Sequence, residues 1–301
     1  MQPISSKKVV TRRDFLKTGG YAAAGSLLGL PLLDRAAARA AAKSRVVLIR
    51  DPNVVDSQGR PNNTVLESML DQAVTTLLGA PDPRSAWQQL FFPGDVVGIK
   101  SNVWSRLPTP RALEKALVHR LQQVGVKFND IAVDDRGVLG NAVFKRSTAL
   151  INVRPMRTHH WSGLGTLLKN YIMFVPAPWM YHGNSCERLG AIWQKPQVAG
   201  KTRLNILVML TPLFHGIGPH HYSSRYVWPY AGLIVSTDPV AADATGARII
   251  EAKRNTFFAG SRPISPPPLH IAAADTRFDL GNSSPERIEL IRMGWGDQIL
   301  I

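Results

Sequence analysis

Apolar residues follow two alternating patterns along most of the chain. Short β-branched runs, such as RVVLIR (45–50) and DVVGIK (95–100), predict buried strands. Between them, residues 63–78 place apolar side chains at every third or fourth position, which predicts a helix. Further strands are predicted at 130–133, 149–153, 204–210, 232–236 and 269–273, and further helices from Thr109-Pro110 to Gly125 and from Asp238-Pro239 onward. This alternation predicts an α/β fold with a mostly parallel sheet and helices on both faces.

Two long segments, 174–201 and 211–230, interrupt this alternation. Both are rich in Gly, Pro and aromatic residues and lack a clean period, so we expect them to form loops or lids. Six of the eight histidines lie between residues 159 and 221, within or beside these segments. The sequence therefore predicts long loops rich in histidine and aromatic residues around one part of the sheet.

The first 42 residues have the features of an export signal. Arg12-Arg13 is followed by Phe-Leu-Lys, then by an apolar run over 19–33 and by Ala-x-Ala triplets. This order is typical of a twin-arginine signal, and the apolar run is too short for a standard membrane-spanning helix. We expect the twin-arginine translocase to recognise this segment and the signal to be cleaved between residues 38 and 43. The mature chain, residues 43–301, is then expected to be a single α/β domain without a transmembrane span. We expect it to be exported, to the periplasm or another extracytoplasmic location.

Charge and cysteine content narrow the functional classes. The chain has 301 residues, 36 Lys and Arg against 21 Asp and Glu, and a net charge of +15. Residues 1–42 hold seven basic and two acidic residues, so their removal lowers the net charge by 5 to +10. Export and scattered basic residues argue against nucleic acid as a partner. A single cysteine, Cys186, excludes an intramolecular disulfide and a self-contained Cys₄ iron–sulfur cluster.

Candidate chemistry lies where predicted strands end. Ligands of open α/β sheets bind beyond the carboxyl ends of the strands, and three polar clusters occupy such positions. They are Lys100-Ser101-Asn102, Arg157-Thr158-His159-His160, and Ser236-Thr237-Asp238 with Asp243 further along the helix. Structural alternatives are a helix N-cap for Asp238, a helix-dipole contact for Asp243 and a solvated strand end for Lys100. We expect the three clusters to share one edge.

The histidines suggest a transition metal, since imidazole suits zinc, copper, nickel or iron. His215, His220 and His221 flank a short Gly-Pro segment and could converge with His159 and a carboxylate such as Asp243. The alternative is that these histidines bond loop backbone and pack with aromatic rings.

Three segments resemble a known family in order and spacing. GDVVGIKSN (94–102), NVRPMRTHHWSGLGTLLKN (152–170) and LIVSTDPVAADATGARII (233–250) are similar to the hallmarks of the domain of unknown function 362 family over about residues 94–252. The resemblance assigns family-type positions to Lys100, Asn102, Thr158, His159, Lys169, Asn170, Asp238 and Asp243. Arg157 stands where the family has Lys, which keeps the charge but changes its geometry.

The resemblance also bears on cofactors and partners. Some family members carry fused ferredoxin-like iron–sulfur modules, and this chain lacks the cysteines for one. A cluster-dependent role would require a redox partner protein.

Two functional hypotheses follow. The first is a metal- or cofactor-dependent periplasmic enzyme that acts on an anionic small molecule, with Lys100, His159, Lys169, Asp238 and Asp243 as catalytic candidates. Asn102, Arg157, Thr158 and Asn170 would then bind the ligand. The second is a non-catalytic envelope protein that binds a ligand or assists an iron–sulfur redox partner. The cofactor identity, the substrate and the oligomeric state do not follow from the sequence.

Overall fold

The computed structural model describes residues 43–216, 218 and 221–301. The predicted export signal (1–42) and His220 lie outside the described residues. The strands are β1 (Ser44–Arg50), β2 (Val97–Lys100), β3 (Ile131–Asp134), β4 (Ala149–His159), β5 (Gly163–Gly165), β6 (Thr202–Leu213), β7 (Gly232–Ser236) and β8 (Ile288–Gly294). The helices are α3 (Asn63–Leu78), α4 (Pro83–Leu90), α5 (Arg111–Gln123), α6 (Ala142–Lys145), α7 (Leu167–Asn170), α8 (Gly183–Cys186), α9 (Gly190–Trp193), α10 (Pro239–Phe257) and α11 (Leu269–Thr276). Short 3₁₀ turns are η1 (Pro52–Val54), η2 (Phe128–Asp130), η3 (Tyr171–Phe174), η4 (Pro178–Tyr181), η5 (Glu187–Leu189), η6 (Ser224–Tyr226) and η7 (Pro285–Arg287).

One eight-stranded sheet organises the fold, which confirms the predicted α/β class. The order is β3-β2-β4-β6-β7-β1-β8, with β5 paired to the far end of β4. The pairs β2–β3, β2–β4, β4–β6 and β1–β8 are parallel, whereas β7 is antiparallel to both β6 and β1. The chain therefore leaves β2, β3, β4 and β6 in one direction and leaves β7 in the opposite direction.

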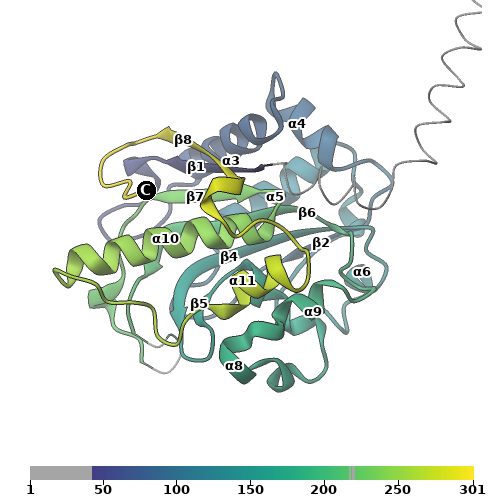
Figure 1. Cartoon of the computed structure of the whole chain (residues 1–301). Helices are drawn as coiled ribbons and strands as arrows, with labels where there is room; N and C mark the ends of the chain where they lie inside the picture. The colour runs from purple at the N-terminus through teal and green to yellow at the C-terminus, as the bar shows by residue number, and fades with distance from the viewer. Residues whose placement is uncertain (1–42, 217, 219–220) are drawn as a thin grey trace, which may run out of the picture. The chain divides into compact units, whose positions relative to one another are not determined.

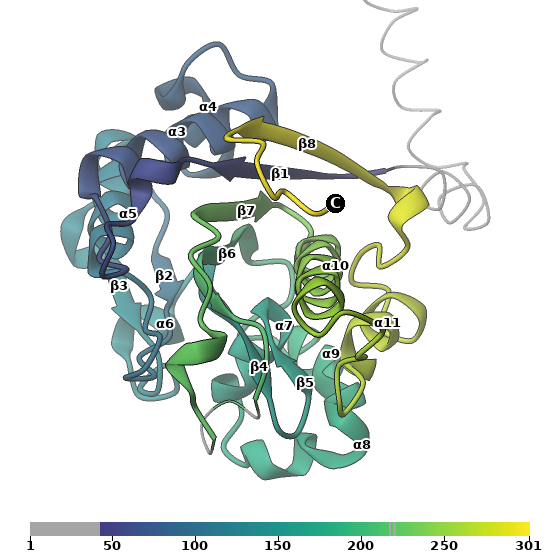
Figure 2. The ribbon, with the colours of Figure 1, turned by 90° about the vertical axis from the view of Figure 1, so that its left-hand side faces the viewer.

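Helices cover both faces of the sheet (Figures 1 and 2). Alternate residues of the strands point into two separate apolar cores. One core packs against α3, α4 and α5, and the other against α7, α9, α10 and α11. No helix in the described part of the chain is both long enough and apolar enough to cross a membrane.

Local sequence explains why α3 coincides with its predicted bounds. The Asn62 side chain accepts a hydrogen bond from the Val65 N–H at the start of the helix. Gly79 ends the helix in the left-handed conformation, with φ of 62°, which glycine adopts at low cost. Six buried apolar residues at helical spacing hold the helix against the sheet.

Other predicted elements need correction. Residues 269–273 form the start of helix α11 rather than a strand, because a short apolar run does not separate helix from strand and three alanines favour the helix. The predicted loop 174–201 contains the short helices α8 and α9, and residues 211–213 extend β6. The apolar pattern also missed α4 and β8.

Strand β4 extends well beyond its neighbour β2. The last pair between them joins Lys100 to Asn152, and β5 pairs with β4 only from Arg157 onward. Pro155 lies in the interval between these pairings, where a residue without an N–H is tolerated at an unpaired strand edge. The second half of β4 therefore projects past the end of β2 toward the loops of that edge.

The antiparallel direction of β7 separates Asp238 from the other strand-end clusters. Its side chain accepts hydrogen bonds from the Val240 and Ala241 N–H groups at the start of α10. It also accepts from the Asn282 N–H and from the Ser44 hydroxyl. The expectation that all three clusters share one edge is wrong, and Asp238 occupies the helix N-cap.

This arrangement predicts a structural role for Asp238. Asp238→Ala should lower the free energy of unfolding by about 2 to 3 kcal/mol, because the cap and the links to Asn282 and Ser44 are lost together. Asp82→Ala removes only the exposed cap of α4 and should lower the free energy of unfolding by clearly less than Asp238→Ala does. Chemical denaturation of both variants measures the difference, and an Asp238→Ala variant as stable as wild type would contradict the assignment.

Candidate functional site

A cavity of about 330 Å³ opens at the edge where β2, β3 and β4 end. Its lining comprises Asn102, Trp104, Asp135, Arg136, Arg154, Arg157, His159, Trp161, Lys169, Asn170, Ile172, Met173, Pro178 and His182. Five of these, Asn102, Arg157, His159, Lys169 and Asn170, are site residues expected from the sequence. The structure thus brings together the first two predicted clusters.

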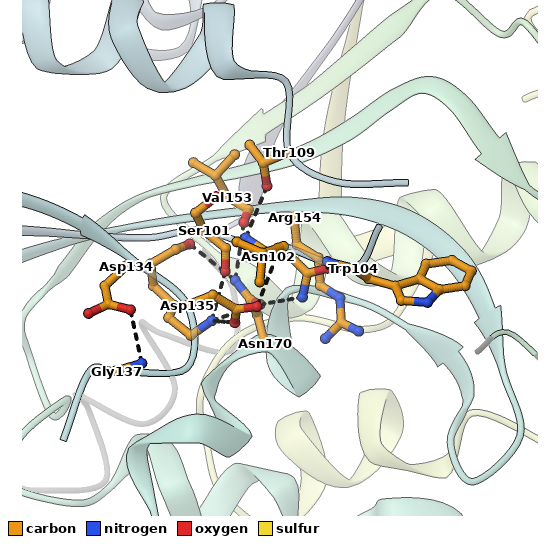
Figure 3. Close-up of polar contacts among 12 residues, drawn as sticks. Ser101, Asn102, Trp104, Thr109, Asp134, Asp135, Gly137, Val153, Arg154 and Asn170 are labelled. Carbon is orange, nitrogen blue, oxygen red and sulfur yellow. Dashed lines mark hydrogen bonds and ion pairs between the residues drawn. The ribbon is translucent and has the colours of Figure 1, made fainter. Parts of the chain in front are cut away.

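Asn170 joins the strands beneath the cavity. Its carboxamide nitrogen donates to the carbonyls of Lys100 and Val153 and to the Asn152 side chain, over 2.9 to 3.1 Å. Its oxygen accepts from Lys100 Nζ at 3.2 Å and from the Asn102 amide at 3.4 Å. Figure 3 shows Asn170 and Asn102 turned toward each other beside Asp135. One amide therefore connects β2, β4 and α7.

Lys100 is a structural cation behind this lining. Its Nζ lies 2.5 Å from Asp135 and also donates to the Ser101 carbonyl and to Asn170. Burial lowers the pKa of Lys100 to about 8, against the attraction of Asp135. All three of its N–H donors are engaged, so Lys100 holds the ends of β2 and β3 together.

The guanidinium groups of Arg154 and Arg157 form the cationic part of the cavity. Both residues are at most 4% exposed. Arg157 donates to the Asn102 oxygen at 2.9 Å and lies over the Trp104 ring, with Cζ 4.6 Å from its centroid. Burial lowers the pKa of both side chains, that of Arg154 to about 10. A Cβ on Gly165 would lie 2.8 Å from Arg154 Nη2, so a glycine there leaves room for the guanidinium.

Three N–H positions of these guanidinium groups have no hydrogen-bond partner in the described part of the chain. They are Nε of Arg154 and both Nε and Nη1 of Arg157. A buried donor without a partner costs about 1 to 3 kcal/mol, and more when it is charged. These donors therefore lack an acceptor from the described residues, and a bound anion would supply one.

Asp243 supports the cavity without lining it. It is fully buried on α10, and its two carboxylate oxygens accept from the backbone N–H groups of Leu167 and Leu168, each at 2.9 Å. These are the first residues of α7, which carries Lys169 and Asn170 into the cavity. Asp243 is therefore a positioning residue for α7.

The rings of the segment 159–182 form one wall. His159 stacks on His160 with centroids 4.7 Å apart, and Trp161 stacks on His182 at 3.8 Å. Burial, with added repulsion from Lys169 and Arg154, lowers the pKa of His159 far below its ordinary value. His159 is therefore neutral at physiological pH and accepts a hydrogen bond from the Trp161 N–H at Nδ1.

A family model matches part of the chain. The model described as Domain of unknown function (DUF362) matches residues 136–248. The chain is similar to this family over that stretch. The matched segment covers a little over a third of the chain and contains Arg157, His159, Lys169, Asn170 and Asp243, whereas Lys100 and Asn102 precede it. No curated protein and no solved structure matches the chain significantly.

The predicted histidine set is not gathered in the described part of the chain. His215 Nδ1 lies 2.8 Å from the Arg254 guanidinium, and its ring contacts Tyr226 and Phe258. His221 is exposed, and His220 falls outside the described residues. Where residues are described, no group of three His, Cys, Asp or Glu side chains could hold a metal ion. Metal binding by His159, His215, His220 and His221 stays a prediction.

Sequence reasoning missed several residues of the site. Arg154 and Asn152 interrupt the apolar strand β4, and Asn205 interrupts β6. Such polar residues in buried strands are the signal that could have revealed them.

Asp134 and Asp135 differ in role, since Asp134 accepts a hydrogen bond from the Gly137 N–H while Asp135 pairs with Lys100. Thr158 is buried on β4 but does not line the cavity.

Replacement of Asp243 should remove a pH-dependent component of stability. Burial raises the pKa of Asp243 from 3.8 to about 7, so the folded protein binds a proton that the unfolded chain releases above pH 4. The wild-type free energy of unfolding should therefore fall relative to that of Asp243→Asn as pH rises from about 4 to about 7, by on the order of 4 kcal/mol. Urea denaturation at intervals across this range measures the difference, and parallel curves for the two proteins would refute it.

Proposed function

We propose that this chain is an exported protein that binds a small molecule with at least two negative charges in the cavity and acts on it as an enzyme. The unpartnered N–H groups of Arg154 and Arg157 are the observation that carries this proposal. A ligand carboxylate or phosphate would supply the missing acceptors, because the planar guanidinium matches those groups.

The charge balance of the cavity favours a multiply charged anion. Arg136, Arg154, Arg157 and Lys169 contribute four cations to its lining, and Asp135 is the one carboxylate among the described lining residues. Because Lys100 lies beside Asp135 and neutralises it, the four cations face the cavity without compensation. A ligand with two or more negative charges would relieve their mutual repulsion.

The remaining walls suggest the rest of the ligand. Trp104, Trp161 and His182 present ring surfaces, and Ile172 and Met173 add apolar contacts. The volume of about 330 Å³ is at the lower end of the range for small-molecule sites. A compact anion that carries a ring or a short apolar part fits this combination.

Catalysis rather than simple binding is favoured by the perturbed side chains in the cavity. Burial lowers the pKa of Lys169 to about 8 and that of His182 to about 4, so near pH 8 the imidazole is neutral and about half of the Lys169 amine is neutral. Such groups can accept protons or attack an electrophile. An anion that binds and is recovered unchanged would favour the alternative of a binding protein.

Removal of one guanidinium should weaken anion binding without loss of stability. For Arg157→Gln, the dissociation constant of pyrophosphate, a polyanionic probe, should rise about 10- to 100-fold, the equivalent of one lost charge-assisted interaction. The free energy of unfolding should stay equal or increase, because Arg157 is buried beside another cation, Arg154. Titration calorimetry measures the first effect and urea denaturation the second.

The matched control is Arg146→Gln, which removes an exposed arginine paired with Asp130. It should bind pyrophosphate as wild type does. Absence of binding to the wild-type chain, or equal affinity of the Arg157→Gln variant, would refute the proposed function.

Export through the twin-arginine route is a separate part of the proposal, supported by Arg12-Arg13, the short apolar run and the Ala-x-Ala triplets. The double change Arg12→Lys and Arg13→Lys keeps the charge and should stop export, since the route reads the arginine pair. Cell fractionation with an antibody against the chain measures the outcome, and Lys7→Arg with Lys8→Arg is the control. Unchanged export of the double-lysine variant would contradict the proposal.

A further inference from the structure

Lys169 differs from the two buried arginines of the cavity, Arg154 and Arg157, in lacking an oxygen partner among the described residues. Its side chain is 3% exposed, and it reaches the cavity from α7. Within the described part of the chain, the one hydrogen-bond contact of its Nζ is with the Cys186 sulfur at 3.6 Å. A buried thiol is a weak acceptor, so the amine is held near the ligand space without being neutralised.

The surroundings of Lys169 disfavour its protonated form. Among the described residues, the charged and titratable groups that act on it besides Cys186 include Arg154, Arg157, His159, His182 and His270. The two nearby carboxylates are committed elsewhere, Asp135 to Lys100 and Asp243 to the start of α7. Burial, assisted by Arg154 and Arg157, lowers the pKa of Lys169 to about 8.

Lys100 is a buried lysine of the same fold with a structural role, and it can be compared with Lys169. It is equally buried, but its Nζ donates to three oxygens and it does not belong to the cavity lining. Lys169 lines the cavity and donates to no oxygen among the described residues. The two lysines therefore have different tasks, and only Lys169 presents its amine to a ligand.

We propose that Lys169 is a nucleophile that forms an imine with ligands that carry an aldehyde or ketone carbonyl beside their anionic group. The inference rests on the proposed anion-binding function and names the substrate class of that site. Arg154 and Arg157 would hold the anionic group while the neutral amine adds to the carbonyl carbon. The C–N bond forms, the C–O bond breaks, and the carbonyl oxygen leaves as water with both amine protons.

Reductive trapping tests this chemistry directly. The full chain is incubated with pyridoxal 5′-phosphate, which combines an aldehyde, a phosphate and a ring, and is then reduced with borohydride. Peptide mass spectrometry should find the reduced adduct on Lys169 at probe concentrations about tenfold below those that label exposed lysines, since the arginines concentrate the anion. Pyridoxal has the aldehyde without the phosphate, so at the same concentration it should label Lys169 about tenfold less.

Two variants complete the experiment. Lys169→Arg keeps the positive charge and should lose the adduct, whereas Arg157→Gln should reduce both the adduct and pyrophosphate binding. Lys145→Arg removes an exposed lysine on α6 and should change neither.

The outcomes separate the two proposals. If pyridoxal 5′-phosphate competes with pyrophosphate for the cavity but leaves no reduced adduct on Lys169, the imine inference is wrong and anion binding stands. Adducts spread evenly over exposed lysines, or equal labelling by pyridoxal, also overturn the inference. If neither anion binds, the proposed function fails and the inference fails with it.

Discussion

Two hydrogen bonds from the start of α7 to the buried carboxylate of Asp243 hold the cavity in shape. They set the position of a four-residue helix that is too short to be stable by itself. Because α7 carries both Lys169 and Asn170, this contact places the amine at the ligand space and the amide at the strand ends. Asp243 lies on α10, and α10 is in turn fixed by the Asp238 cap at the opposite edge. The site therefore depends on contacts made by the first two turns of α10.

The buried cations of the cavity lower the stability of the fold. Arg154, Arg157 and Lys169 are buried together, each with its pKa lowered by loss of solvent. Burial of like charges that form no ion pair among the described residues opposes folding, so the two apolar cores must provide the compensating stability. A protein without a ligand for this space would be more stable with apolar residues there. The anion binding proposed above would offset this cost.

Part of this architecture could be predicted from the sequence, and physical reasons separate that part from the rest. The helix at 63–78 was predictable because period, cap and terminating glycine agree. The Lys100–Asn102 and Arg157–His159 clusters were predictable because both lie at the carboxyl ends of parallel strands. The apolar run GLIVS reads the same in either strand direction, so the reversal of β7 and the displacement of Asp238 could not be seen. Arg154 was hidden because its neighbours in β4 predict a buried strand, in which a cation is not expected.

The connections beneath the cavity are made almost entirely by neutral amides. Asn102, Asn170, Asn152 and Asn205 form a hydrogen-bonded series that runs from the loop after β2 to the Thr237 carbonyl after β7. Carboxylates at these positions would join the same strands, but they would also neutralise the arginines and Lys169. The two buried carboxylates nearby are each consumed, Asp135 by Lys100 and Asp243 by backbone N–H groups. Rigid support is thus obtained without negative charge, which leaves the cations of the cavity available to a ligand.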